Sequence, residues 1–264
     1  MNKVIRAEFG RTINAGLIIA IAGIIFSICF DSFNDLIAGL RNGQGYVGYF
    51  FSNAAFGGMC IKYMLPVFTA LPFSVSLCQE RNNKAVSYIV SREGKNRYIF
   101  AKFIVSAISG GFVAVCGTVL LFLMLAMRFP IAGDEFEGAV VSDYFHEWSA
   151  VYYPQLYILT LSILAFCRGV IWSSLALCVS LYTSDFMVVL LSPFLGSYVL
   201  VRIFQIIRVP DMVRPDMILI GQVVIKSSGV TLIIAIAISL TIVTLIGAFF
   251  VGKMREGLKS GTIY

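Results

Sequence analysis

Charged residues are scarce in this chain. Asp, Glu, Lys and Arg make up 13% of its 264 residues, hydrophobic residues make up 59%, and the mean hydropathy is +0.89. A soluble domain carries about 25% charged residues, so the composition excludes a soluble globular enzyme, a disordered chain and a nucleic-acid-binding module. The net charge of +6 does not indicate nucleic acid as a partner either, because the basic residues lie beside apolar segments, as they do in membrane proteins.

Residues that build metal and catalytic centres are also few. The chain has one His (His146), and none of its six Cys residues forms a C-x-x-C pair, so we expect neither a metal site nor a disulfide framework. The H-E-x-x-H and G-x-S-x-G motifs are absent, and no catalytic residue is assigned. A G-x-x-x-x-G-K pattern at 247–253 is followed by Met254 where a P-loop needs Ser or Thr. The chain is therefore not expected to be an enzyme by itself.

Long apolar segments are what the sequence does contain. A helix of about 20 apolar residues crosses a bilayer, and six segments reach that length, at about residues 13–31, 56–78, 103–127, 154–182, 186–206 and 227–252. The sequence thus predicts an all-α polytopic membrane protein whose single transmembrane domain comprises residues 1–264. Residues 42–58 are uncharged but rich in Gly and aromatics. A seventh span, a loop, or an interfacial or re-entrant segment are all compatible with them, and we favour the last two.

The distribution of charge predicts the orientation. Residues 1–12, 79–102 and 253–264 hold 12 of the 20 Lys and Arg residues, whereas residues 128–153 carry five acidic residues and one Arg. Because basic loops stay in the cytoplasm, we expect both termini there and an extracellular loop at 128–153. Residues 1–12 also carry Val4, Ile5 and Phe9 at helical spacing among basic residues, which predicts an amphipathic interfacial helix.

One charge falls in the middle of a predicted span. Arg168 lies deep in the fourth apolar segment, where an Arg costs about 2.5–3.5 kcal/mol on insertion scales. It either packs inward or snorkels, or it lines a wet passage, in which case Phe68 and Phe73 are candidates to line the same translocation pathway. No Asp or Glu is placed at depth and no inverted repeat is evident, so the sequence does not favour an ion-coupled carrier. A secondary transporter or channel, and a scaffold subunit without transport activity, stay as alternatives.

The basic segment at 79–102 reads QERNNKAVSYIVSREGKNRYIFAK. Ala85, Tyr88 and Ile89 follow an i, i+3, i+4 pattern, which predicts a short amphipathic helix over about residues 80–90 with Glu80 near its start. Gly94 is expected to end it. A helix of this length is not stable alone in water, so it must lie on the membrane or dock into a partner.

Three motifs carry a resemblance to a known family. They are L-P-F-S-V-S-L-C-Q-E-R at 71–81, S-R-E-G-K-N-R-Y-I-F-A-K at 91–102 and L-C-V-S-L-Y-T-S-D-F at 177–186. With the six spans and the N-terminal helix, the chain resembles, over nearly its whole length, the ABC-2 type permease, the membrane subunit of an ATP-binding cassette exporter. In that family the second span ends in Glu, a coupling helix follows, and a Lys opens the third span. Glu80 and Lys102 occupy those places here.

The resemblance implies that ATP binding and substrate transport take place on different subunits. A separate ATPase subunit would bind ATP and Mg²⁺, and this chain would bind no cofactor. The coupling helix would dock in a groove of that ATPase through residues that all lie in the basic segment, namely Glu80, Arg81, Ala85, Tyr88 and Ile89. A second permease, either a copy or a paralogue, would complete the transporter in the lipid bilayer of a bacterial plasma membrane. The substrate class implied is an antimicrobial peptide, a drug or another amphipathic molecule.

Overall fold

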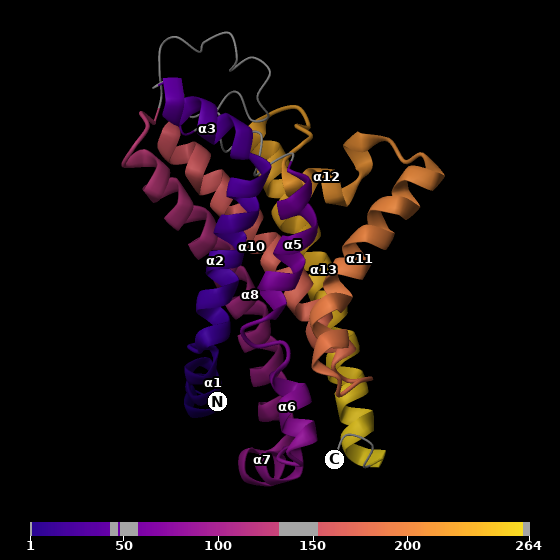
Figure 1. The fold of residues 1–264 in the computed structure, drawn as a ribbon. Helices are drawn as coiled ribbons and strands as arrows, with labels where there is room; N and C mark the ends of the chain where they lie inside the picture. Colours follow the sequence, from indigo (N-terminus) through magenta and orange to yellow (C-terminus); the bar gives the residue numbers. More distant parts are fainter. Residues whose placement is uncertain (1, 43–46, 48–57, 132–152, 261–264) are drawn as a thin grey trace.

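The computed structural model describes residues 2–42, 47, 58–131 and 153–260, and this part of the chain is helical and contains no strand (Figure 1). The helices are α1 (Asn2–Thr12), α2 (Ala15–Asp31), α3 (Phe33–Asn42), α5 (Met59–Ala70), α6 (Ser76–Asn82), α7 (Val86–Glu93), α8 (Lys95–Ala126), α10 (Pro154–Val179), α11 (Phe186–Ile207), the 3₁₀ helix η4 (Asp211–Val213), α12 (Pro215–Ile220) and α13 (Ser228–Ser260). Nearly all of the ambiguous segment at 42–58 and of the expected loop at 128–153 lies outside the described residues.

Four of the described helices, α8, α10, α11 and α13, are long and apolar enough to cross a membrane. A fifth candidate is the pair of α1 and α2, which meet at a bend of 57°. These helices give the chain the character of a multi-pass membrane protein. The predicted span at 56–78 is not a single helix, because α5 has 12 residues and a turn at 71–75 separates it from α6, and six spans stay a prediction. Pro72 lies in that turn and has no N–H with which to continue the helical hydrogen-bond series.

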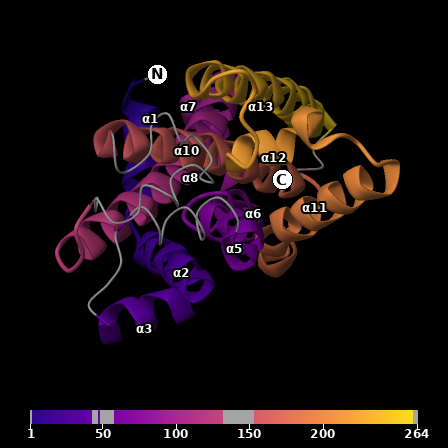
Figure 2. The ribbon, with the colours of Figure 1, turned by 90° about the horizontal axis from the view of Figure 1, so that it is seen from above.

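Helices α8 and α10 form the centre of the bundle. Seen from above, they lie between α2 and α5 on one side and α13 on the other, while α11 leans away from them (Figure 2). They cross where both helices carry small residues, Ser106 and Gly110 on α8 and Gly169 and Ser173 on α10. The Ser173 hydroxyl donates to the Ser106 carbonyl at 2.9 Å. Small residues at such a crossing allow two helix backbones to approach closely within a membrane.

Helices α11 and α13 have much less of their surface covered by the rest of the chain. Their apolar side chains point outward, with Ile233, Leu240 and Leu245 on α13 each more than half exposed. A large apolar surface of this kind is unfavourable in water, but it matches the hydrocarbon core of a bilayer.

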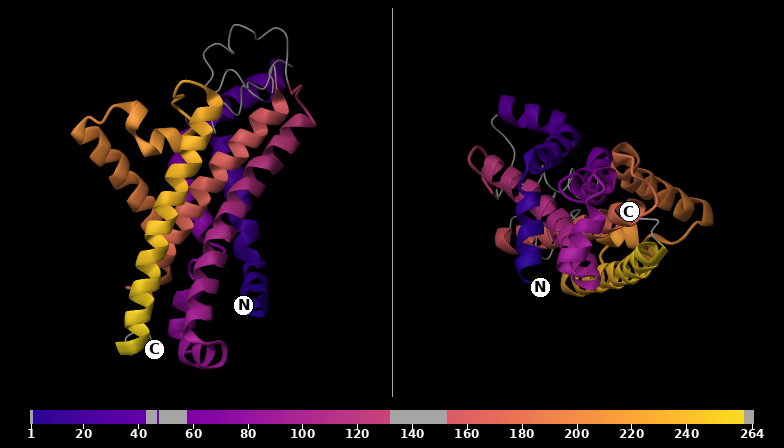
Figure 3. Two further views of the ribbon diagram at one scale, coloured as in Figure 1. Left: turned by 180° about the vertical axis from the view of Figure 1, so that it is seen from behind. Right: turned by 90° about the horizontal axis from the view of Figure 1, so that it is seen from below.

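Both ends of the described chain lie at the same end of the molecule, together with α6 and α7 (Figures 1 and 3). Helices α3 and α12 lie at the opposite end. The three basic segments are thus gathered at one end, as the charge pattern predicted, and the side of the membrane that this end faces stays a prediction.

Asp31 connects α2 to α5. Its carboxylate, at the end of α2, accepts hydrogen bonds from the backbone N–H groups of Cys60 at 2.9 Å and Ile61 at 2.8 Å. These are unpaired donors of the first turn of α5, whose own N-cap, Gly58, has no side chain to satisfy them. The carboxylate also lies at the positive end of the α5 helix dipole.

We expect Asp31→Ala to lower the free energy of unfolding by about 1–2 kcal/mol, as loss of a helix cap does. Thermal unfolding of the detergent-solubilised protein measures this change. Asp31→Asn keeps one acceptor oxygen and should lose less. The control is Asp35→Ala on α3, because Asp35 is not bonded to α5. An equal loss in both Ala variants would contradict the capping role.

Candidate functional site

The basic segment forms two helices instead of the single one predicted over residues 80–90. Helix α6 ends at Asn82, and α7 begins at Val86 after a turn in which Lys84 has a left-handed backbone with φ of 53°. Gly94, with φ of 85°, follows the last residue of α7 and carries the chain directly into α8. A side chain is strained at such an angle and Gly is not, so Gly94 sets the sharp reversal between α7 and α8.

Helix α7 buries a different face from the one its spacing predicted. Val86 and Val90 are the buried pair, and they pack in a cluster with Tyr98 of α8 and Leu258 of α13. Tyr88, predicted on the apolar face, is 67% exposed. Ala85 lies in the turn as the N-cap of α7, and Ile89 is half-buried beside the cluster. The outward face therefore presents Tyr88 on a helix that is supported from behind by two long helices.

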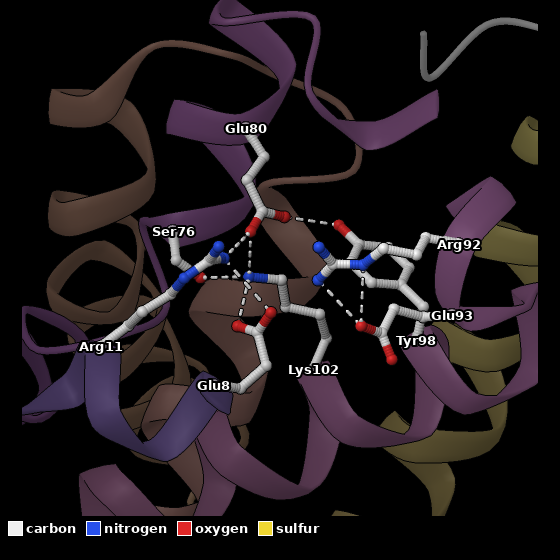
Figure 4. Close-up of polar contacts among 8 residues, drawn as sticks. All are labelled: Glu8, Arg11, Ser76, Glu80, Arg92, Glu93, Tyr98 and Lys102. Carbon is white, nitrogen blue, oxygen red and sulfur yellow. Dashed lines mark hydrogen bonds and ion pairs between the residues drawn. The ribbon is translucent and has the colours of Figure 1, made fainter. Parts of the chain in front are cut away.

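Above α7, four charged side chains from three helices form one network, which we call the ion cluster and in which every member but Arg11 is buried: Glu8 and Arg11 of α1, Glu80 of α6 and Lys102 of α8 (Figure 4). The Lys102 ammonium contacts Glu80 Oε1 at 2.8 Å and Glu8 Oε2 at 3.0 Å. Arg11 Nη1 contacts Glu80 Oε1 at 2.7 Å and Glu8 Oε1 at 3.2 Å. Two carboxylates therefore share two cations, and the ion cluster is neutral as a whole.

Neutral groups complete the ion cluster. Lys102 is 0% exposed, and its ammonium also donates to the Ser76 hydroxyl at 3.1 Å and lies 4.7 Å from the centre of the Phe73 ring. The Tyr98 hydroxyl donates to Glu80 Oε2 at 2.6 Å. Lys102 is thus held by two carboxylates, a hydroxyl and an aromatic face, which is how a buried charge is tolerated. Through these contacts the ion cluster ties α1, α6 and α8 together directly above α7.

Arg81 connects α6 to the turn after α10. Its Nη1 donates to the carbonyls of Ser180 at 2.9 Å and Leu181 at 3.1 Å, and the Asn82 amide donates to the carbonyl of Ser184 at 3.2 Å. Two of the three motifs that carry the resemblance, at 71–81 and 177–186, are therefore in contact. Of the five residues assigned to ATPase coupling, Glu80 and Arg81 hold the helices together, and Tyr88 projects away from them.

The three residues assigned to a translocation pathway are not brought together. Arg168 lines a cavity among α5, α10, α11, α12 and α13. Phe68 packs on Gly23 so closely that a Cβ atom there would overlap its ring. Phe73 is 1% exposed and lies beneath the Lys102 ammonium. Neither Phe lines the cavity of Arg168.

The sequence interpretation missed Glu8 and Tyr98, and it placed Glu80 and Lys102 without pairing them. A usable signal was present on α1, where Ile5, Glu8 and Thr12 follow an i, i+3, i+7 pattern and form the face that is turned inward, with Glu8 and Thr12 buried. A carboxylate on the inward face of a membrane-adjacent helix requires a buried cation, and Lys102 opens the third apolar segment. The apolar strip of Val4, Ile5 and Phe9 hid this pattern.

Among the residues that the structure describes, no group of three or more His, Cys, Asp or Glu side chains is placed to hold a metal ion. No family model matches the chain, and no curated protein and no solved structure was found to be similar to it.

Proposed function

We propose that this chain is the permease subunit of an ATP-driven exporter of the ATP-binding cassette class. The observation that carries the proposal is the geometry of α7. This short helix lies at the basic end of the bundle, its inward face packs on α8 and α13, and its outward face presents an exposed aromatic residue, Tyr88. An exposed Tyr on a firmly supported helix is typical of a residue that anchors a protein interface.

In this proposal a separate ATPase subunit binds ATP and Mg²⁺ and receives Tyr88 in a groove. Movement of the ATPase pushes α7 against Tyr98 of α8 and Leu258 of α13, with which Val86 and Val90 are packed. Because Tyr98 is also bonded to Glu80, the push reaches the ion cluster, and α1, α6 and α8 move as one unit. A second permease, a copy or a paralogue, forms the other wall of the passage. The amphipathic substrate leaves across the plasma membrane.

The test is the Tyr88→Asp substitution in a complex purified with its ATPase. A carboxylate in place of the ring removes the apolar anchor and adds a charge that the groove would have to desolvate. We expect the ATPase to dissociate from the variant or to lose its stimulation by the permease, and ATP-dependent export from proteoliposomes to be abolished. A photoreactive amino acid at position 88 should cross-link to the ATPase.

Tyr153 supplies the matched control. It is 57% exposed and precedes α10, at the end of the bundle opposite α7. Tyr153→Asp should leave ATPase binding and export unchanged. Export that continues without ATP, or full coupling in the Tyr88→Asp variant, would contradict the proposal, the first result favouring a secondary transporter or channel.

A further inference from the structure

The cavity that contains Arg168 is lined by residues of α5, α10, α11, α12 and α13. Its volume is about 170 Å³. Most of its walls are apolar, and they include Leu65, Trp172, Leu200 and Ile242. Two cationic side chains line it as well, Arg168 from α10 and Lys62 from α5.

Among the residues that the structure describes, none forms an ion pair with Arg168. The residue is 8% exposed, and its Nε atom is buried without a hydrogen-bond acceptor. The carboxylate that lines the same cavity, Asp216, is already occupied by Arg214, which donates to its two oxygens at 3.2 and 2.8 Å. A guanidinium offers five N–H donors in a planar fork that matches an oxyanion. A buried cation without a counter-ion is costly, so this site is incomplete without an anion.

The shape and chemistry of the cavity indicate which kind of group is attached to that anion. An apolar wall beside the cation pair favours a hydrocarbon body, and Lys62 adds a second positive charge that would repel a cationic group. We propose that the cavity binds an anionic amphiphile, with a carboxylate or phosphate head on Arg168 and Lys62 and a hydrocarbon chain between α11 and α13. This inference names a substrate class for the exporter proposed above and in that respect rests on it. Binding itself needs no ATPase.

Trp172 gives the cavity its own reporter, because the chain has two Trp residues and Trp148→Phe leaves Trp172 alone. The full-length Trp148→Phe protein is placed in phosphatidylcholine vesicles, and bromine atoms on acyl chains quench the fluorescence of a Trp residue that they contact. Dibrominated phosphatidylglycerol and dibromostearate are the two anionic probes, and dibrominated phosphatidylcholine at the same mole fraction is the reference. We expect quenching by an anionic probe to exceed that by the reference and to saturate.

Arg168→Gln should weaken binding of the anionic probe, measured from the excess quenching, by about tenfold or more. This is the loss that corresponds to a charge-assisted hydrogen bond. Arg168→Lys, which keeps the charge without the fork, should retain part of it. The control is Arg202→Gln on α11, because Arg202 is exposed and stacks on Tyr198 outside the cavity. That variant should bind like the parent, which separates the cavity from general attraction to the surface.

Competition in the parent protein gives a readout that does not depend on whether a variant folds. Unbrominated dodecyl phosphate should relieve the excess quenching, and dodecyltrimethylammonium should not. An excess with phosphatidylglycerol identifies a bilayer lipid as the occupant, and an excess with dibromostearate alone identifies a free amphiphile. Equal quenching by all probes, relief by the cationic competitor, or an excess that a folded Arg168→Gln variant retains would overturn the proposal. None of these outcomes bears on ATP coupling through Tyr88.

Discussion

We expect Lys102→Met to lower the free energy of unfolding by about 3–5 kcal/mol, the cost of removing one partner from a buried ion pair. The substitution keeps most of the side-chain volume and removes the ammonium from between Glu8 and Glu80. Both carboxylates are more than nine-tenths buried, and Arg11, with 54% of its side chain exposed, is the cation that would be left to them. One buried negative charge is then uncompensated.

The size of the effect is measured from the unfolding midpoint of detergent-solubilised protein, and a rescue variant identifies its cause. Glu8→Gln combined with Lys102→Met removes one charge of each sign and leaves Arg11 and Glu80 as a neutral pair at 2.7 Å. We expect the double variant to recover a large part of the stability that Lys102→Met loses. Without recovery, the loss would reflect packing of the Lys102 chain and not its charge.

The pair of Lys253 and Glu256 on α13 is a matched control for Lys102. Its ammonium and carboxylate are also 2.8 Å apart, but both side chains are largely exposed. Exposed ion pairs contribute little to stability, because water solvates each partner after the other is removed. Lys253→Met should therefore leave the unfolding midpoint unchanged. A loss equal to that of Lys102→Met would show that burial is not what gives the ion cluster its strength.

The long helices of this fold could be predicted from composition alone. Apolar segments of the right length, with at most one charge in each, identified α8, α10, α11 and α13, because a bilayer imposes both length and apolarity on a spanning helix. The same reasoning does not locate the point at which a helix is interrupted. Residues 56–78 are mostly apolar, with Lys62 as their one charge, and hydropathy does not register the turn at 71–75 that separates α5 from α6.

Contacts between residues that lie far apart in the chain could not be predicted from the sequence. Lys102 lies 94 residues from Glu8 and 22 residues from Glu80, and hydropathy treats each as a charge to be kept near the surface. The fold brings all three together and buries them, because they neutralise one another. Arg168 shows the reverse case. Its depth, and the absence of an acidic residue from the predicted spans, were evident from the sequence, whereas the presence of Asp216 in its cavity and the pairing of Asp216 with Arg214 were not.

Small residues in apolar segments carry structural information that hydropathy also overlooks. Gly110 and Gly169 belong to different predicted spans, and nothing in a count of apolar residues marks them. In the fold they are where α8 and α10 meet. A Cβ atom built on Gly169 would lie 2.5 Å from the carbonyl oxygen of Gly110 and 2.9 Å from the Cα atom of Gly111. These are backbone atoms, which cannot turn aside as a side chain can.

Gly169→Ala should therefore separate the two central helices and lower the free energy of unfolding by about 2–3 kcal/mol, toward the upper end of overpacking costs. The separation would also weaken the hydrogen bond from Ser173 to the Ser106 carbonyl, one helical turn away. Unfolding in detergent measures the loss, and a pair of spin labels on α8 and α10 measures the separation.

Gly252 is the matched control for Gly169, because it is also a helical glycine but a Cβ atom there would meet nothing within 4 Å. Gly252→Ala should raise the free energy of unfolding by about 0.5–1 kcal/mol, since Ala restricts the unfolded chain more than Gly does. The same substitution is thus expected to change the free energy of unfolding in opposite directions at the two positions. If both substitutions stabilised the protein, α8 and α10 would not be in backbone contact, and the packing on which α7 and the ion cluster depend would have to be different.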